Sequence, residues 1–380
     1  MAVGVKTLQT GTANVTGNLT MTGAVSTATV ANLLIGGNLS MGNSTFTANG
    51  FTLTINGTTS VGSGGNFTMG SATGAKTFNN TLTIASGGQF TNTVNSNVTF
   101  HNGITNNGTF SAGTSGTYTF DTSPQALTGS FVLPNATVTG INLTNNNSLS
   151  VTTALSGVGG TVTQASNATL DIGGTSGISN ITASAAGNTV TYSGTAQTVH
   201  GNNYVNLGLT GSGVKTLQAA TTNITGNFTI GGTASATAVG ALTIGGNLTL
   251  SGGTFVGGAF NHQLAGNWTN NAGSFTSAGS TITFNGASQT IGGSTGNYIR
   301  QLNNFRNEFN QHRRFYNCVW SIDRRQYIDI HRWRISIYCI RCNECWIGIR
   351  CKLVDHIRYG CENILGTCSG FYFGNMEQLR

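Results

Sequence analysis

The sequence predicts an all-β protein: a repetitive parallel β-solenoid (β-helix) over residues 1–298, followed by an irregular tail over residues 299–380. Three observations predict this fold. Similar units recur at spacings near twenty residues, apolar and hydroxyl residues alternate within each unit, and Gly and Asn pairs separate the units. With 56 glycines, two prolines and 7% charged residues, the chain does not have an ordinary globular composition.

The chain divides sharply by composition. Residues 1–298 hold three lysines, no arginine, two acidic residues and no cysteine, for a formal charge of +1. Residues 299–380 hold all seven cysteines and a formal charge of +6. Because the excess basic charge lies in the tail, we expect no nucleic-acid partner for the repeat region. A long cysteine-free segment suits an extracellular or cell-surface location.

A long repeat organises the first part. The stretch "GVKTLQTGTANVTGNLTMTG" from Gly4 recurs without a gap as "GVKTLQAATTNITGNFTIGG" from Gly213. Met1 lies just ahead of a repeat unit, and "MAVGVKTLQT" lacks the apolar core and cleavage site of a signal peptide. No window approaches eighteen consecutive apolar residues, so we expect no membrane-spanning helix. These features indicate a fragment of a longer repeat protein.

Two shorter signatures lie inside the long repeat. The motif "GNLT", or a close variant, occurs at twenty-residue spacing within two clusters, at Gly17, Gly37, Gly226, Gly246 and Gly266. A second signature occurs as "TYTFDTSPQ" at Thr117, "TVTYSGTAQTVHG" at Thr189 and "TITFNGASQTIGG" at Thr281. Alternation in "NLTM", "TLTI" and "TITF" predicts short strands with one buried face, and the intervening "GG", "NG" and "NN" predict tight corners.

Strands of this length with Gly and Asn corners favour a parallel β-solenoid in which each coil rests on the last. At ~4.8 Å per coil, about fifteen coils would form a rod roughly 70 Å long. Irregular repeat spacing over residues 85–180 leaves an antiparallel repeat array open there.

The stretch "AGNWTNNAGSFTSAGSTITFNGASQTIGG", Ala265 to Gly293, resembles the repeats of very large bacterial surface or secreted β-strand-repeat proteins. These are the adhesin, autotransporter-passenger and filamentous-haemagglutinin-like class, and the resemblance covers residues 1–298. It implies export, an extracellular or outer-membrane-associated location and a solenoid stalk that is frequently adhesive. It also implies partners such as host or matrix glycans, surface proteins or further copies of the chain.

The sequence does not predict an enzyme. Asp121 and Asp171 are the only acidic residues in the first 298, fifty residues apart in different repeats. A carbohydrate-active β-helix stays an alternative if a groove brings these two carboxyl groups within a few ångströms. His101, His200 and His262 lie in turn-like contexts, so we expect them at surface corners. None has a second ligand at metal spacing, so no metal site is predicted at them.

Runs such as "TLT", "TYT" and "TIT" raise a further alternative, an ice-binding solenoid, because ranked hydroxyls on a flat sheet would order water. Threonine is equally the natural outward residue of a neutral strand. Regular ranks are expected to need coils of constant length, and a flat face with threonine at equal spacing over five or more coils would favour ice binding. Trp268 occupies the Leu or Phe position of its sister repeats, so we expect it in the core. No catalytic, cofactor-binding or metal-binding residue is predicted.

The tail has three interpretations: a genuine Cys-rich domain, a diverged cap of the solenoid, or out-of-frame translation. At face value, Cys339, Cys342, Cys345 and Cys351 approach the spacing of a zinc or iron–sulfur site without matching it, and Cys318, Cys361 and Cys368 make the total odd. Alternatively, the codons permitted for "IDRRQY", Ile322 to Tyr327, include the "LTIGGN"-type repeat when they are read one base later. We favour a frameshift between Tyr298 and Arg300, after which the tail is out-of-frame translation.

The source nucleotide sequence across codons 290 to 310 tests the frameshift. The shifted frame is expected to continue the Gly-Gly-Asn repeat without stop codons. Early stop codons in that frame, or the absence of the repeat, would refute it.

Overall fold

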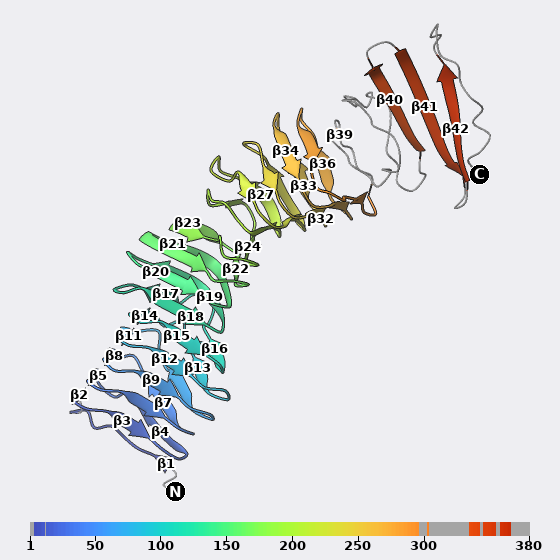
Figure 1. The fold of residues 1–380 in the computed structure, drawn as a ribbon. Helices are drawn as coiled ribbons and strands as arrows, with labels where there is room; N and C mark the ends of the chain where they lie inside the picture. Colours follow the sequence, from blue (N-terminus) through green and yellow to red (C-terminus); the bar gives the residue numbers. More distant parts are fainter. Residues whose placement is uncertain are drawn as a thin grey trace.

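The protein is a rod of stacked β-coils in the computed structural model (Figure 1). The structure describes residues 4–11 and 13–295 and, beyond them, the strands β39 to β42. No helix occurs among these residues, and the named strand pairs from β1 to β39 are all parallel. The predicted all-β parallel solenoid is therefore confirmed.

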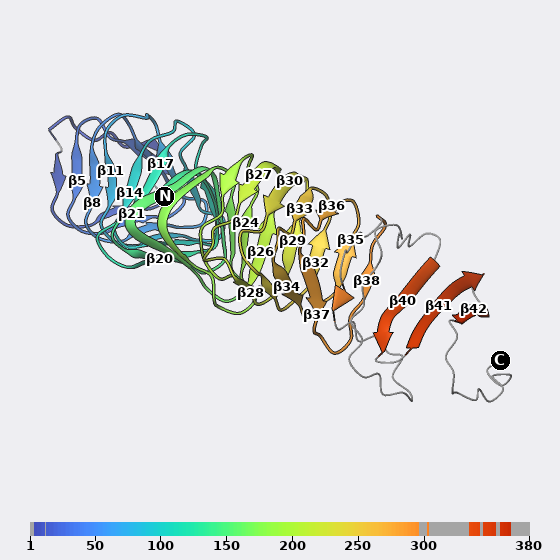
Figure 2. The same ribbon diagram turned by 90° about the horizontal axis from the view of Figure 1, so that it is seen from above.

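Successive coils stack along three ladders, which run along the rod (Figures 1 and 2). Nearly every coil contributes a strand segment to each ladder, and in the coil of β24 (Thr189–Tyr192) and β25 (Gln197–Thr198) isolated bridges at Tyr204 continue the third ladder. Ladder 1 holds β1 (Gly4–Val5), β4 (Val25–Ala28), β7 (Thr45–Ala48), β10 (Asn66–Met69), β13 (Gln89–Thr91), β16 (Thr109–Ser111), β19 (Ser130–Val138), β21 (Ser148–Gln164), β22 (Thr169–Ile172), β24 (Thr189–Tyr192), β26 (Asn206–Leu209), β29 (Phe228–Ile230), β32 (Leu248–Leu250), β35 (Trp268–Asn270) and β38 (Ile291–Gly292). The long strands β19 and β21 bend through corners, so their later parts belong to the next ladders.

Ladder 2 holds the later part of β19, the middle of β21 and β2 (Asn14–Val15), β5 (Leu33–Ile35), β8 (Leu53–Ile55), β11 (Lys76–Phe78), β14 (Val98–Phe100), β17 (Thr117–Phe120), β23 (Thr175–Thr182), β25 (Gln197–Thr198), β27 (Ser212–Thr216), β30 (Thr233–Thr237), β33 (Thr254–Val256) and β36 (Ser274–Thr276). Ladder 3 holds the ends of β21 and β23 and β3 (Leu19–Met21), β6 (Leu39–Met41), β9 (Thr59–Val61), β12 (Leu82–Ile84), β15 (Ile104–Asn106), β18 (Gln125–Thr128), β20 (Asn142–Asn145), β28 (Asn223–Ile224), β31 (Thr243–Ile244), β34 (Asn261–Leu264), β37 (Thr281–Phe284) and β39 (Leu302–Asn303).

About fourteen coils are complete, close to the fifteen expected. In the tail, β40 (Arg334–Cys342), β41 (Cys345–Val354) and β42 (Arg358–Leu365) pair antiparallel. The rest of the tail, its cysteine side chains and the proposed frameshift point at residues 298–300 lie outside the described residues.

The core is a set of inward columns in which like residues stack from coil to coil. The rings of Phe46, Phe67, Phe90 and Phe110 follow one another with centroids 5.4, 5.6 and 4.6 Å apart. These distances approach the ~4.8 Å between adjacent strands, because each ring sits at the same place in its own coil. Trp268 is fully buried, as predicted.

Coil length varies, yet strand register is kept. The offset between paired strands ranges from 17 residues, for Thr189 with Asn206, to 23 residues, for Asn66 with Gln89. The corners absorb the difference, so the expectation that regular ranks need constant coil length was wrong. The antiparallel array considered for residues 85–180 is also wrong, because the strand pairs from β13 to β23 are parallel.

The "GN" signature forms a corner ladder. A Cβ added to Gly266 would lie 2.3 Å from the carbonyl carbon of Gly246, so stacked glycines leave no room for side chains. The neighbouring asparagines form a chain of hydrogen bonds, in which Asn247 N donates to Asn227 Oδ1 and Asn267 N donates to Asn247 Oδ1, at 2.9 and 2.8 Å. The signature therefore ties each coil to the next.

The two copies of the long repeat do not occupy equivalent ladders. The "GVK" at Gly4 lies in β1 on ladder 1, whereas the "GVK" at Gly213 lies in β27 on ladder 2. The second copy is thus turned by one face about the rod axis. The sequence repeat does not reveal this rotation, since the irregular coils between the copies set it.

Candidate functional site

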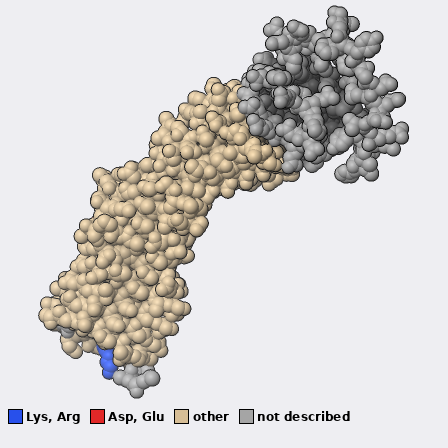
Figure 3. All heavy atoms as spheres, viewed as in Figure 1, with Lys and Arg blue, Asp and Glu red and all other residues tan. Residues whose placement is uncertain are grey.

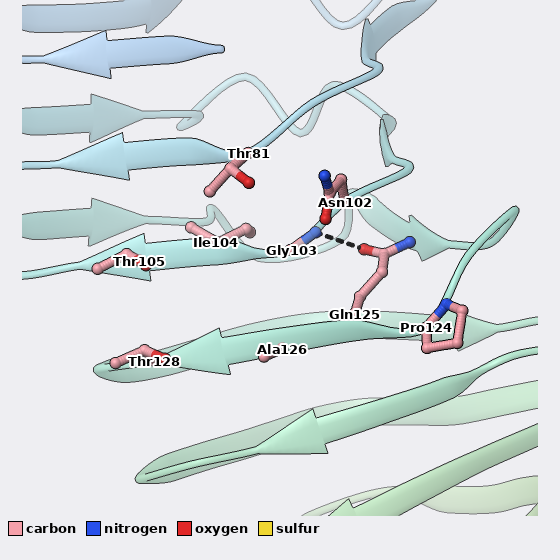
Figure 4. A pocket seen from close by; sticks show the side chains of 9 residues that line it. All are labelled: Thr81, Asn102, Gly103, Ile104, Thr105, Pro124, Gln125, Ala126 and Thr128. Carbon is pink, nitrogen blue, oxygen red and sulfur yellow. Dashed lines mark hydrogen bonds between the residues drawn. The ribbon is translucent and has the colours of Figure 1, made fainter.

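A notch opens on ladder 3 across β12, β15 and β18 (Figure 4). Its volume is about 380 Å³, and it is lined by Thr81, Asn102, Gly103, Ile104, Thr105, Pro124, Gln125, Ala126 and Thr128. These residues include no charged side chain. Sequence reasoning missed this site, because its lining comes from three successive coils.

Two small residues create the notch. The strand registers place Thr81, Gly103, Ala126 and Thr144 in one outward column of ladder 3. Gly103 has no side chain and Ala126 has only a methyl group, so the surface is hollowed between the two threonines. Gly103 has φ +62°, and a Cβ there would lie 2.6 Å from the Ala126 carbonyl oxygen, so glycine is required.

The corner at residues 121–125 forms one wall of the notch. Thr122 has φ +75°, which is strained for a β-branched residue. Three hydrogen bonds hold this conformation: Ser123 N to Asp121 O, Ser123 Oγ to His101 O, and Thr122 Oγ1 to Asp121 Oδ1, at 2.9, 2.6 and 2.9 Å. The corner thereby fixes the ring of Pro124 at the edge of the notch.

Gln125 locks the same corner from inside. Its Oε1 accepts from Gly103 N at 2.9 Å, shown in Figure 4. Its Nε2 donates to Phe100 O and to Asp121 O, each at 2.7 Å. Both amide protons are therefore used, and the side chain acts as a tie between coils.

This tie explains the second short signature. Gln197 and Gln289 also donate from Nε2 to the carbonyl 25 residues earlier. In those two corners, however, Oε1 accepts from the glycine three positions before the glutamine. Thr122 stands where they have glycine, and the oxygen of Gln125 turns to Gly103 instead. The corner beside the notch is thus built differently from its two sister corners.

The structure brings together two residues that the sequence flagged separately. His101 Nε2 lies 3.1 Å from Asp121 Oδ1, and the side chains are 27% and 34% exposed. They continue an outward column in which Asn79 Nδ2 donates to Asn56 Oδ1 at 2.7 Å. The pair therefore replaces an Asn–Asn rung of a corner ladder.

The two aspartates are not brought together. Asp121 follows β17 between ladders 2 and 3, whereas Asp171 lies in β22 on ladder 1 and accepts from Ser150 Oγ at 3.0 Å. They lie three coils apart, roughly 14 Å along the axis. Paired carboxylates in glycosidases are ~5–9.5 Å apart. This arrangement does not favour the carbohydrate-active alternative.

Two of the three histidines lie at partly exposed corners, as expected: His101 and His200. The prediction for His262 was wrong, because it is only 1% exposed. The alternation of β34 points it inward, where its Nδ1 accepts from Leu242 N at 3.0 Å and its Nε2 lies 2.7 Å from Gly257 O. Burial lowers its pKa, and the neutral ring with its proton on Nε2 satisfies both contacts.

Two lysines are buried, which the sequence analysis did not anticipate. Lys76 is 1% exposed, and its Nζ donates to Phe51 O, Thr73 O and Gly74 O at 2.9, 2.8 and 2.7 Å. Alternation in "KTF" places Lys76 on the same inward face as Phe78. The burial of Lys76 could therefore have been predicted from this alternation.

Lys215 is fully buried in a similar cage. Its Nζ donates to Gly194 O, Thr195 O and Gln197 Oε1 at 2.7, 2.7 and 2.6 Å. Burial lowers its pKa to about 8, because neutral acceptors replace water incompletely around an ammonium. Lys6, at the equivalent place in the first repeat copy, is exposed.

One column of hydroxyls is regular. Thr54, Thr77, Thr99, Thr119 and Thr137 pair directly along ladder 2. Each lies between two buried residues of its strand and faces outward. The column therefore has the number and the register of threonines, over five coils, that the sequence analysis set as one condition for ice binding.

No cluster of three or more His, Cys, Asp or Glu side chains capable of holding a metal occurs in the part of the chain that the structure describes. Within that part there is also no helix long and apolar enough to cross a membrane.

Comparison with family models, with curated proteins and with solved structures found no significant match to this chain. The resemblance to bacterial surface repeat proteins accordingly rests on the sequence repeats, and the solenoid fold rests on the structure.

The buried lysines predict an unusual pH dependence of stability. The folded-state pKa of Lys215 is about 8, below its usual value of 10.5. The unfolded state therefore binds more protons between these values, so stability rises with pH through this window. Burial raises the pKa values of Tyr118, Tyr192 and Tyr204, so stability falls again above about pH 10.

Urea unfolding from pH 7 to 9.5 should show a gain of about 1–2 kcal/mol. Lys215→Met should reduce the gain, whereas Lys6→Met, at the exposed equivalent, should preserve it. An unchanged pH dependence in Lys215→Met would contradict this assignment.

Proposed function

We propose that this chain is a non-catalytic structural and adhesive rod of a bacterial surface or secreted protein. Its role is to present hydroxyl and amide groups along an extended, neutral surface. The observation that carries this proposal is the combination of a continuous core with an almost uncharged exterior. The export and location belong to the proposal and follow the resemblance of the repeats.

The exterior supports contact with neutral partners. The view in Figure 3 shows basic atoms only beside the N-terminal end of the described rod and no acidic atoms. The residues that face outward on the strands are mainly Thr, Ser and Asn. Such groups form hydrogen bonds with glycans or with the exposed groups of surface proteins, each contributing about 1 kcal/mol.

Adhesion in this mechanism comes from many weak contacts. A rod of repeated coils offers similar groups at regular intervals, so contacts after the first become intramolecular and raise the overall avidity. The rod supplies reach and stiffness, because each coil is tied to the next by backbone ladders, Asn ladders and glutamine ties. No single reactive group is required.

The test is retention of the purified chain on surfaces coated with neutral glycans. Retention should change less than about twofold between 0.05 and 0.5 M NaCl, because few charges are available for screening. The glycans should also remain intact after incubation. Loss of retention in salt, release of hydrolysed sugar, or no retention on any glycan surface would contradict the proposal.

An ice-binding solenoid is a second candidate, favoured by the column from Thr54 to Thr137. Five threonines in register on successive strands form a row of hydroxyl and methyl groups spaced by ~4.8 Å. Ser156 continues the row in the next coil. A row of this kind is able to hold an ordered line of water molecules against a growing crystal.

Thermal hysteresis of the chain would test this candidate. Thr99→Lys, in the middle of the column, should abolish hysteresis, because a charged side chain disrupts the row. Thr229→Lys, an outward residue of β29 on another ladder, should not. No hysteresis in the unmodified chain, or equal hysteresis in the two variants, would rule out ice binding through this column.

A further inference from the structure

We propose that the notch on ladder 3 binds one pyranose ring of a neutral glycan. The inference rests on the proposed adhesive function and deepens it, since it assigns the contact to one place and names the class of ligand. The notch has a volume of about 380 Å³. This lies near the lower end of the ~300–1,000 Å³ of small-molecule sites, which suits one sugar ring.

The absence of charged side chains from the lining of the notch favours a neutral ligand. Its lining residues include no Asp, Glu, Lys, Arg or His. The nearest titratable groups in sequence, His101 and Asp121, lie outside the lining and contact each other at 3.1 Å. An anionic or cationic ligand would lose water without gaining a partner of opposite charge.

The hydrogen-bonding groups of the notch suit a polyol. Among the described residues, no partner is found for the hydroxyls of Thr81 and Thr105, and Asn102 Nδ2 donates to Asn80 Oδ1 while its own oxygen stays available. Thr128 Oγ1 accepts from Asn146 Nδ2 at 2.9 Å and keeps its proton to donate. The notch therefore offers both donors and acceptors, as a ring of sugar hydroxyls requires.

Apolar surface lies between these polar groups. The floor is Gly103 and the methyl of Ala126, and the ring of Pro124 stands at one side (Figure 4). A pyranose has C–H groups on its ring faces and hydroxyls around its edge. The arrangement matches that division: the apolar floor takes a ring face, and the threonines and Asn102 take the edge.

The notch is also preorganised. The Pro124 wall follows Thr122, whose φ of +75° is strained for a β-branched residue and persists only where the surroundings enforce it. Hydrogen bonds from Ser123 and Gln125 enforce it here. The sister corners at Gln197 and Gln289 use glycine at this position and lack the proline. A wall already fixed before binding loses little conformational entropy when a ligand arrives.

Saturation-transfer NMR with methyl pyranosides, using the full chain, tests the proposal. The probes are the methyl glycosides of glucose, galactose, mannose and N-acetylglucosamine, with methyl glucuronide as a charged comparison. At least one neutral probe should bind with a Kd in the millimolar range, as a single shallow subsite allows. Methyl glucuronide should bind at least about fivefold more weakly.

Two variants locate the binding. Ala126→Leu fills the notch from an outward position and should weaken binding at least about tenfold. Thr105→Val removes one hydroxyl without changing shape and should weaken binding about fivefold. The matched control is Thr198→Leu, because Thr198 follows Gln197 as Ala126 follows Gln125. Its binding should equal that of the unmodified chain. Circular dichroism and melting temperature verify that each variant is folded.

The outcomes distinguish failure of the notch as a glycan site from failure of the adhesive function of the rod. Equal binding in Ala126→Leu and in the unmodified chain would overturn the notch, as would preference for the charged probe. If Ala126→Leu binds the probes as the unmodified chain does and is also retained on glycan-coated surfaces, the adhesive function stands while the notch assignment falls. If the unmodified chain is retained on no glycan surface and binds no probe, both fall.

Discussion

Parallel, in-register hydrogen bonding between successive coils is the constraint on which the rest of this structure depends. Each strand must present its amide and carbonyl groups at the same height as its neighbours, so each coil repeats the inward and outward pattern of the last. Phe67 stacks between Phe46 and Phe90 for this reason. The same register aligns Thr77 with Thr54 and Thr99 on the outer surface. The stacking of the core residues and the alignment of the outward residues thus both follow from in-register hydrogen bonding.

Much of this fold could be predicted from the sequence, because alternation and corner residues are local signals. The strands around "NLTM" and "TITF", the burial of Trp268 and the solenoid itself were predicted correctly. What could not be predicted depends on which coils become neighbours. Lys215 Nζ is hydrogen-bonded in a cage that includes Gln197, eighteen residues earlier, and His262 Nδ1 accepts from Leu242 N, twenty residues earlier. The local pattern around His262 suggested a surface corner, and the pattern around Lys215 gave no prediction, because the contacts of both side chains come from neighbouring coils.

The candidate site could be predicted from the sequence only in part, for the same reason. The sequence singled out His101 and Asp121 but not their contact, since their alignment follows from corners of unequal length. The notch arises from an absence of side-chain volume at Gly103 and Ala126, which no motif announces. Its fixed wall arises from a strained Thr122 held by neighbours in two coils. The notch therefore lies where the repeating pattern of side chains and corners along the rod is interrupted.

The most direct test of the in-register stack is a distance between two outward positions on ladder 2, measured by pulsed electron spin resonance. Labels carried by non-natural residues at Thr54 and Ser156 leave the cysteines of the tail unlabelled. Five strand spacings predict a backbone separation of ~24 Å with a narrow distribution. A much longer separation, or a broad distribution, would contradict parallel in-register stacking and with it the arrangement of both the threonine column and the notch.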